Sequence, residues 1–194
     1  MNVEKNIDRK SFSGKGVFPA KYAFTLLLPI RNIVFSPKKL ISLLNLRSDT
    51  KVLEIGSGPG YFSIKVAEKI KNEKLYLFDI QKEMLDYAKK RIEKKGLKNV
   101  EYYIADGKTF PFESNFFDIV YMVTVFSEIE EKQTYIKEIH RILKPAGLVS
   151  ISETAGDPDK MSLEEIKKLF SDFGFKEDNE SGSLFYYSVN FKKL

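Results

Sequence analysis

Short apolar runs alternate with amphipathic stretches from residue 51 to the end of the chain. The apolar runs predict strands at 51–55, 75–79, 100–104, 117–123 and 148–153. Apolar residues spaced three or four apart predict helices at 60–70, 82–95, 132–143 and 162–173. Strands that alternate with helices in this way are typical of an α/β fold around a mainly parallel sheet.

Glycine and proline mark where several of these elements should end. Gly96 should stop the second helix, and Pro145-Ala146-Gly147 should stop the third. The last stretch, 175–191, has the pattern of two strands around a polar turn at 179–183. We therefore predict a hairpin that adds antiparallel strands to one edge of the sheet.

The first fifty residues have a different pattern. They predict two helical pieces, at 21–28 and 37–44, because Pro29 should break the first and Ser36-Pro37 suits the start of the second. The segment is unusually apolar and aromatic, so we expect it to cover another surface. A peripheral membrane contact is an alternative, because lysines flank the apolar residues.

Length and composition restrict the class of protein. A chain of 194 residues with 43% hydrophobic and 30% charged residues should form one domain. The net charge of +5 comes from lysines interleaved with Glu and Asp, which favours a solvated surface over a nucleic-acid groove. The absence of cysteine excludes disulfides, thiolate metal sites and cysteine nucleophiles, and we predict no metal site. A polar start and the lack of an apolar run of about 18 residues lead us to expect a cytoplasmic protein without a transmembrane segment.

The most informative segment follows the first predicted strand. Three glycines stand at alternate positions, and the carboxylate of Glu54 lies two residues before the first of them. Such glycines let the backbone turn sharply and let a ligand approach it. Tyr61 stands where a dinucleotide fingerprint needs glycine or alanine, and the Lys-Ser/Thr pair of a P-loop is absent. A carboxylate here would repel pyrophosphate, so we expect a ligand that carries positive charge.

The pattern Glu-x-Gly-x-Gly-x-Gly resembles motif I of the class I S-adenosylmethionine-dependent methyltransferases. Residues 116–121 resemble the family's fourth-strand motif, and 139–148 resemble its turn from a helix into strand five. The similarity extends over about 50–192 and is greatest to the type 11 subgroup, which includes ubiquinone- and menaquinone-biosynthesis enzymes. It implies a Rossmann-like, doubly wound, mainly parallel sheet of seven strands in the order 3-2-1-4-5-7-6, with strand 7 antiparallel and helices on both faces. Residues 49–194 would form this domain, and residues 1–48 a helical lid on it.

Two further carboxylates close predicted strands, at the edge where open α/β sheets bind ligands. Asp79 ends the second strand about 20 residues after Gly60, where an adenosine ligand needs an acceptor for its ribose hydroxyls. The alternative for Asp79 is a helix N-cap. Asp106 ends the third strand, and the resemblance implies that it accepts a hydrogen bond from the adenine amino group. A plain Asp-Gly turn with Gly107 is the alternative.

The resemblance also implies how S-adenosylmethionine is held. In the family the glycines pass under the ribose and methionine, the acidic residue helps to hold the ammonium, and an apolar residue contacts the adenine. Tyr22, in the proposed lid, has a physical reason to hold the sulfonium through cation–π attraction, with core packing as the alternative. The expected cofactor-binding residues are Glu54, Gly56, Ser57, Gly58, Gly60, Asp79, Ile80, Asp106, Gly107, Thr124 and Tyr22.

A catalytic base is harder to identify. Glu128 is the candidate, because the loop after the fourth strand borders the methyl group in this family; capping of the next helix is the alternative. Related quinone-type enzymes often have His-His there, where this chain has Ser127-Glu128. The single histidine, His140, is predicted on a helix at the opposite end of the sheet, where we expect it to pack or lie at the surface.

The sequence thus predicts an S-adenosylmethionine-dependent methyltransferase (EC 2.1.1) with a small-molecule or lipid-like acceptor and S-adenosylhomocysteine as product. No Asn/Asp-Pro-Pro-Tyr/Phe follows the fourth strand, which disfavours amino-group methylation of adenine or glutamine. A tRNA or rRNA methyltransferase and a catalytically idle binding protein of the same fold are the alternatives. The sequence predicts neither the acceptor's identity nor the oligomeric state.

Overall fold

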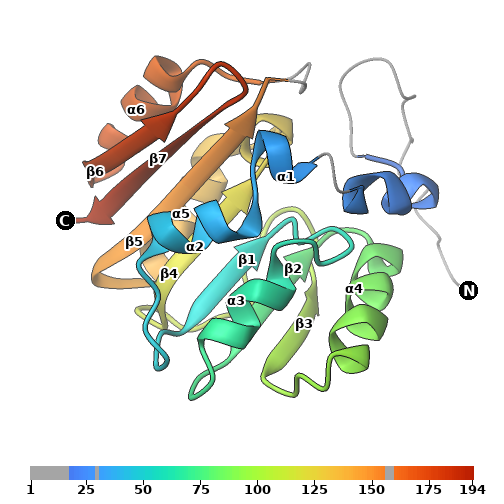
Figure 1. Cartoon of the computed structure of the whole chain (residues 1–194). Coiled ribbons are helices and arrows are strands. Elements are labelled where there is room, and N and C mark those ends of the chain that lie inside the picture. Colours follow the sequence, from blue (N-terminus) through green and yellow to red (C-terminus); the bar gives the residue numbers. More distant parts are fainter. Residues whose placement is uncertain (1–17, 29–30, 156–159) are drawn as a thin grey trace, which may run out of the picture.

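The computed structural model describes residues 18–28, 31–155 and 160–194, and in this part of the chain seven strands form one sheet (Figure 1). The strand order is β3-β2-β1-β4-β5-β7-β6. Neighbouring strands from β3 to β5 are parallel, whereas β7 is antiparallel to both β5 and β6. The predicted order and the antiparallel seventh strand are confirmed. The strands are β1 Val52–Ile55, β2 Leu75–Asp79, β3 Val100–Ile104, β4 Phe117–Val123, β5 Leu143–Thr154, β6 Phe175–Gly182 and β7 Tyr186–Lys193.

Helices cover both faces of the sheet (Figure 1). Alternate strand residues point to opposite faces: Val52 belongs to the same buried cluster as Leu44 and Ala67 on one side, and Leu53 belongs to the cluster that contains Ile136 on the other. The central strands are therefore buried on both sides, which explains their nearly continuous apolar runs. Among the described helices, none is long and apolar enough to cross a membrane. The helices are η1 Ala20–Leu27, α1 Arg31–Val34, α2 Pro37–Leu44, α3 Ser63–Lys69, α4 Lys82–Lys94, η2 Phe126–Glu128, α5 Lys132–Ile142 and α6 Leu163–Ser171.

The beginning of β5 differs from the prediction. Helix α5 ends at Ile142, and strand pairing begins at once, since Leu143 pairs with Phe117 of β4. Pro145–Gly147, expected only to stop the helix, lies within β5, where the register shifts between Phe117 and Ile119. Such an irregularity admits a proline into a strand, because its missing N–H is not needed in the disrupted ladder.

Other predicted boundaries are also wrong. Strand β6 continues to Gly182 because residues 179–182 pair with β7, so the hairpin turn lies at 183–185. Helix α3 begins at Ser63 and not at residue 60, because Gly60 has a left-handed backbone with φ of 73°. The first helical piece is a 3₁₀ helix, and the short helix α1 was not predicted.

We expect the capping box at the start of α6 to stabilise the fold. Ser162 Oγ accepts the Glu165 N–H at 3.3 Å, and the Glu165 carboxylate accepts the Ser162 N–H at 2.9 Å. Ser162→Ala should lower the free energy of unfolding by about 1 kcal/mol, because a first-turn donor loses its acceptor. Ser171→Ala, at the exposed end of the same helix, is the matched control. Urea unfolding measures both variants, and equal effects would mean that the cap contributes nothing.

Candidate active site

The glycine loop, residues 56–60, lies at the carboxyl end of β1 and is bonded to the end of β2. The Gly56 N–H donates to the Phe78 carbonyl at 2.7 Å, and the Gly58 N–H donates to Asp79 Oδ2 at 2.8 Å. Gly56, Gly58 and Gly60 all have positive φ, of 69°, 51° and 73°. The loop and Asp79, singled out separately in the sequence, are therefore in direct contact.

Close packing requires glycine at two of these positions. A Cβ on Gly56 would lie 2.4 Å from Cγ2 of Val125, in the loop after β4. A Cβ on Gly60 would lie 3.0 Å from the Cβ of Ala88 on α4. The first contact is too short for a Cβ unless Val125 shifts, and the second requires Ala88 to move by a few tenths of an ångström. The glycine loop is thus fixed between α4 and the segment that follows β4.

Ser57 presents a buried polar atom in the middle of this loop. Ser57 is 6% exposed, and its Oγ has no hydrogen-bond partner in the described part of the chain. Buried hydroxyls are nearly always bonded, so an orphan in a ligand loop marks a place where a polar ligand atom fits. Helix α4 also contributes to the loop, because Arg91 Nη1 donates to the Pro59 carbonyl at 2.6 Å. The sequence analysis missed Arg91.

Glu54 lies in β1 directly beneath the loop and is 3% exposed. Ser63 Oγ, at the start of α3, donates to its Oε2 at 2.5 Å, and the buried Tyr121 hydroxyl lies close by without a well-aligned hydrogen bond. Burial outweighs the effect of these two hydroxyls and raises the pKa of Glu54 to about 7; the charge of Asp79 acts in the same direction. A positively charged ligand group nearby would favour the carboxylate.

Asp79 binds backbone with both carboxylate oxygens. Oδ2 accepts from Gly58, and Oδ1 accepts the Gln81 N–H at 2.9 Å. The residue is 7% exposed, and burial raises its pKa against the effect of these two bonds. The N-cap alternative is wrong, because Gln81 is the N-cap of α4. Each oxygen keeps a second lone pair that a ribose hydroxyl would use, and Ile80 beside it is partly exposed, as an adenine contact requires.

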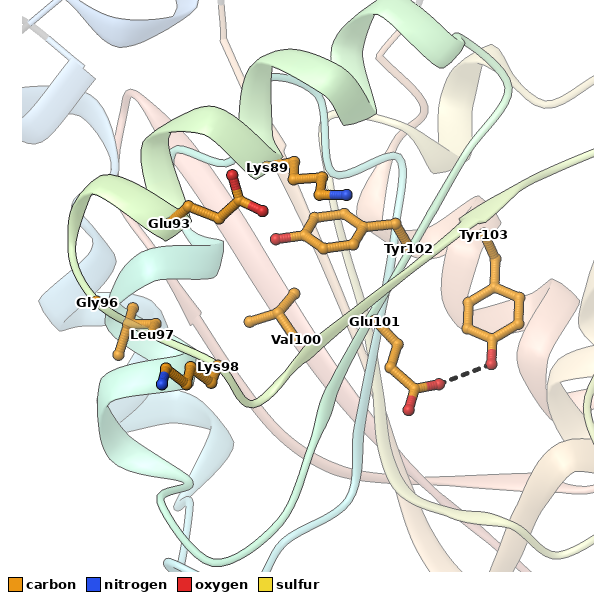
Figure 2. Close-up of a pocket in the computed structure, with 9 residues that line it drawn as sticks. All are labelled: Lys89, Glu93, Gly96, Leu97, Lys98, Val100, Glu101, Tyr102 and Tyr103. Atoms are coloured by element: carbon orange, nitrogen blue, oxygen red, sulfur yellow. Dashed lines mark hydrogen bonds between the residues drawn. The ribbon is translucent and has the colours of Figure 1, made fainter.

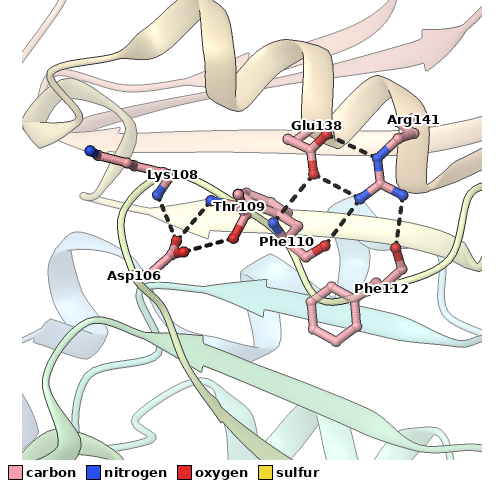
Figure 3. A network of polar contacts seen from close by, with 7 residues as sticks. All are labelled: Asp106, Lys108, Thr109, Phe110, Phe112, Glu138 and Arg141. Carbon is pink, nitrogen blue, oxygen red and sulfur yellow. Dashed lines mark hydrogen bonds and ion pairs between the residues drawn. The ribbon is translucent and has the colours of Figure 1, made fainter.

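Asp106 forms a tight turn after β3 (Figure 3). Oδ1 accepts the N–H groups of Lys108 and Thr109 at 2.8 and 2.7 Å, and Oδ2 accepts the Thr109 hydroxyl at 2.7 Å. These bonds lower the pKa of the exposed Asp106 carboxyl to about 2. The turn alternative is therefore correct as local structure, with Gly107 at φ of 79°. The contact with an adenine stays a prediction.

The loop after β4 brings the other candidate residues to the same edge. Thr124 has a left-handed backbone, φ 54°, and its N–H donates to the Ser152 carbonyl at 2.8 Å. Glu128 is half-buried in η2, and its capping alternative is wrong, because Glu131 is the N-cap of α5. Whether Glu128 acts as a base stays a prediction.

The structure adds a carboxylate that the sequence analysis missed. Glu153, near the end of β5, is fully buried, and its Oε1 accepts from Ser127 N–H at 3.2 Å and Ser127 Oγ at 3.0 Å. The Met161 N–H donates to the same Ser127 hydroxyl at 2.9 Å. These contacts join the loop after β4 to the segment that leads into α6. A carboxylate near the carboxyl end of a predicted strand was the available signal.

The N-terminal segment contacts this edge of the sheet. Gln81 Nε2 donates to the Phe18 carbonyl at 2.7 Å, and the Leu26 Cδ1 of η1 would lie 3.8 Å from a Cβ on Gly58. Tyr22, in the same 3₁₀ helix, is half-buried. The lid role of this segment and the sulfonium contact of Tyr22 stay predictions, and the predicted lid residues 1–17 and 29–30 lie outside the described part of the chain.

Two other features lie away from this edge. The His140 ring packs edge-on against Phe175, with centroids 5.3 Å apart, at the opposite end of the sheet, which confirms its packing role. A hollow beside the outer strand β3 contains none of the predicted site residues (Figure 2). Its lining residues are Lys89, Glu93, Gly96, Leu97, Lys98, Val100, Glu101, Tyr102 and Tyr103.

Comparison with known proteins identifies relatives of this chain. A family model described as a methyltransferase domain matches residues 46–184. The uncharacterized methyltransferase YdaC of Bacillus subtilis is 31% identical over 124 residues, which cover 62% of this chain and 67% of YdaC. The ubiquinone/menaquinone biosynthesis C-methyltransferase UbiE of Francisella tularensis is 26% identical over 141 residues, 72% of this chain and 55% of UbiE. This chain therefore matches about half the length of that relative.

A solved structure shows the same fold. The crystal structure of a SAM dependent methyltransferase from Aquifex aeolicus has a TM-score of 0.86 at 24% identity, covering 92% of this chain and 100% of that one. The family match covers more than half of this chain and includes the glycine loop, Asp79 and Asp106. The chain therefore belongs to the class I S-adenosylmethionine-dependent methyltransferases, EC 2.1.1, as a distant relative of the UbiE-like C-methyltransferases.

Proposed function

We propose that this chain methylates a small, apolar or lipid-like acceptor and binds S-adenosylmethionine at the glycine loop. The observation that carries the proposal is the bond between the Gly58 N–H and Asp79 Oδ2, because it places the glycine loop against a buried carboxylate that would accept the ribose hydroxyls. Ser57 Oγ, buried and unbonded, provides one more polar contact for a ligand. These contacts support cofactor binding and give no reason to prefer the alternative of a catalytically idle binding protein.

The donor set of the site fits the cofactor. S-adenosylmethionine carries a ribose diol, an α-ammonium and a sulfonium, which call for acceptors and negative charge. Asp79 would bind the diol, Glu54 would support the ammonium, and Asp106 with Ile80 would contact the adenine. No Lys or Arg lies between Glu54 and Ile64, so the loop suits a cation better than a phosphate.

The chemistry needs alignment more than proton transfer. When bound, S-adenosylmethionine supplies an electrophilic methyl group on its sulfonium. Well-aligned reactants reach effective molarities of about 10⁵ M or more, so the protein's task is to orient the acceptor and exclude water. The loop that contains Thr124 and Glu128 would border this space, and the bonds between Ser127 and Glu153 hold it in place. Glu128 would take a proton where the acceptor must lose one.

Two observations support an apolar acceptor. The relative from Francisella tularensis is a C-methyltransferase of ubiquinone and menaquinone biosynthesis. In this chain the rings of Phe35 and Tyr186 meet at 4.9 Å, and the exposed side chains of Ile33, Leu184 and Phe185 lie next to them in sequence. Exposed apolar side chains beside this aromatic pair suit contact with a largely apolar acceptor.

We expect S-adenosylhomocysteine to bind, and two substitutions to abolish or weaken its binding. Gly56→Ala forces a Cβ against Val125, and Asp79→Ala removes the ribose acceptor and the Gly58 bond. Each should raise the Kd by about tenfold or more. The control is Gly96→Ala, which has the same backbone strain, φ 72°, but open space around it. Calorimetry decides: no binding to the wild type at about 1 mM ligand, or unchanged binding in both variants, would contradict the proposed site.

Binding of S-adenosylhomocysteine should depend on pH through Glu54. Its carboxyl is protonated below a pKa of about 7 and ionised above it. Because the ionised Glu54 carboxylate attracts the ligand's ammonium, affinity should rise as pH increases from about 6 to 8. Below pH 7, ligand binding should release a proton from the Glu54 carboxyl. Glu54→Gln should bind more weakly and without this rise. A wild-type affinity that falls over the same range would contradict the role of Glu54.

The acceptor class can be tested with labelled methyl groups. With tritium-labelled S-adenosylmethionine, we expect radioactivity to enter a reduced, demethylated menaquinone that partitions into organic solvent, and not bulk tRNA. Glu128→Gln should lower the rate without a matching change in the Kd of S-adenosylhomocysteine. Labelling of tRNA alone, with binding that weakens steeply as salt rises, would favour the nucleic-acid alternative.

A further inference from the structure

The segment between β3 and β4, residues 105–116, carries Asp106 but contains no helix or strand. Backbone bonds fix its two ends, from the Ala105 N–H to the Asp79 carbonyl at 2.9 Å and from the Asn115 N–H to the Arg141 carbonyl at 2.9 Å. The part between them needs other anchors. Figure 3 shows two groups of polar contacts there, the Asp106 turn and the side chains of Glu138 and Arg141 on α5.

The Arg141 guanidinium binds the middle of this segment. Nη1 donates to the Phe112 carbonyl at 2.8 Å, and Nη2 donates to the Phe110 carbonyl at 3.1 Å. Nε and Nη2 also donate to the Glu138 carboxylate, at 2.9 and 2.7 Å, and Glu138 Oε2 accepts the Phe110 N–H at 3.3 Å. Together, the two α5 side chains satisfy both backbone polar groups of Phe110.

These contacts are more than a surface ion pair. The side chains of Arg141 and Glu138 are 36% and 24% exposed, and a helix-surface pair of this kind contributes little by itself. Phe110 and Phe112 are buried in the core, so their carbonyls require partners. A guanidinium presents five donors in a rigid fork and reaches two carbonyls and a carboxylate at once, which an ammonium cannot do.

The two anchors are adjacent in the chain. Asp106 is bound to the N–H and hydroxyl of Thr109, and Thr109 directly precedes Phe110. The Phe110 ring packs on Phe78 with centroids 4.9 Å apart, next to Asp79 at the end of β2. A shift of Phe110 would therefore move Thr109 and the Asp106 carboxylate together.

We propose that Arg141 is a positioning residue for the cofactor: together with Glu138 it fixes residues 110–112, and so holds Asp106 where it accepts a hydrogen bond from the adenine amino group. This inference rests on the proposed function. It gives a role to the arginine of the helix-to-strand motif at 139–148, which the cofactor site itself does not use.

The test compares two ligands that differ at one group. S-adenosylhomocysteine has the adenine amino group, and S-inosylhomocysteine has an oxygen in its place. Calorimetry measures both with the wild type, Arg141→Met, Arg141→Lys and the control Lys137→Met, an exposed lysine on the same helix. Arg141→Lys keeps the charge but cannot span both carbonyls, and thermal melting identifies any variant that does not fold.

We expect the wild type to prefer S-adenosylhomocysteine by about tenfold or more, and both Arg141 variants to reduce this preference to about threefold or less. Lys137→Met should keep it. General destabilisation would lower both affinities but not their ratio. An unchanged ratio in a folded Arg141 variant, or equal binding of the two ligands by the wild type, would overturn the inference. Failure of the wild type to bind either ligand would instead overturn the proposed function.

Discussion

The hydrogen bond from the Gly58 N–H to Asp79 Oδ2 is the contact on which the site depends. It joins two segments that parallel pairing brings side by side, the loop after β1 and the end of β2. A carboxylate buried at this depth is costly unless it is bonded, and backbone N–H groups of Gly58 and Gln81 meet that requirement. The site is therefore shaped before any ligand arrives, which reduces the ordering cost of binding.

Much of this architecture could be predicted, because it follows from local patterns. Strands buried on both faces give continuous apolar runs, and the glycine spacing together with Asp79 was enough to predict a ligand loop. The end of helix α5 shortly before Pro145 was also predicted. Its continuation into β5 was not, because strand pairing through a bulge depends on the position of Phe117 in a neighbouring strand. The hairpin turn was misplaced for the same reason.

The site itself was only partly predictable. Residues proposed to bind the cofactor through their own side chains, such as Asp79 and Glu54, stood out by type and position. Residues that hold the backbone of another segment did not, because neither Arg91 nor Glu153 has a sequence neighbour that reveals its partner. For Asp106, by contrast, the sequence did predict local backbone bonds, as the alternative of an Asp-Gly turn. These bonds lower the pKa of its carboxyl, which therefore stays ionised at any ordinary pH.

The contact between Gly56 and Val125 links the two halves of the site. Val125 follows β4 in the loop expected to meet the acceptor, yet its methyl groups fill the space that a Cβ on Gly56 would need. A larger side chain at position 125 would press on the Gly56 backbone, in the loop proposed to bind the cofactor. In this chain, the choice of acceptor is therefore free to vary at neighbouring loop positions more than at position 125, whose volume is limited by the Gly56 backbone.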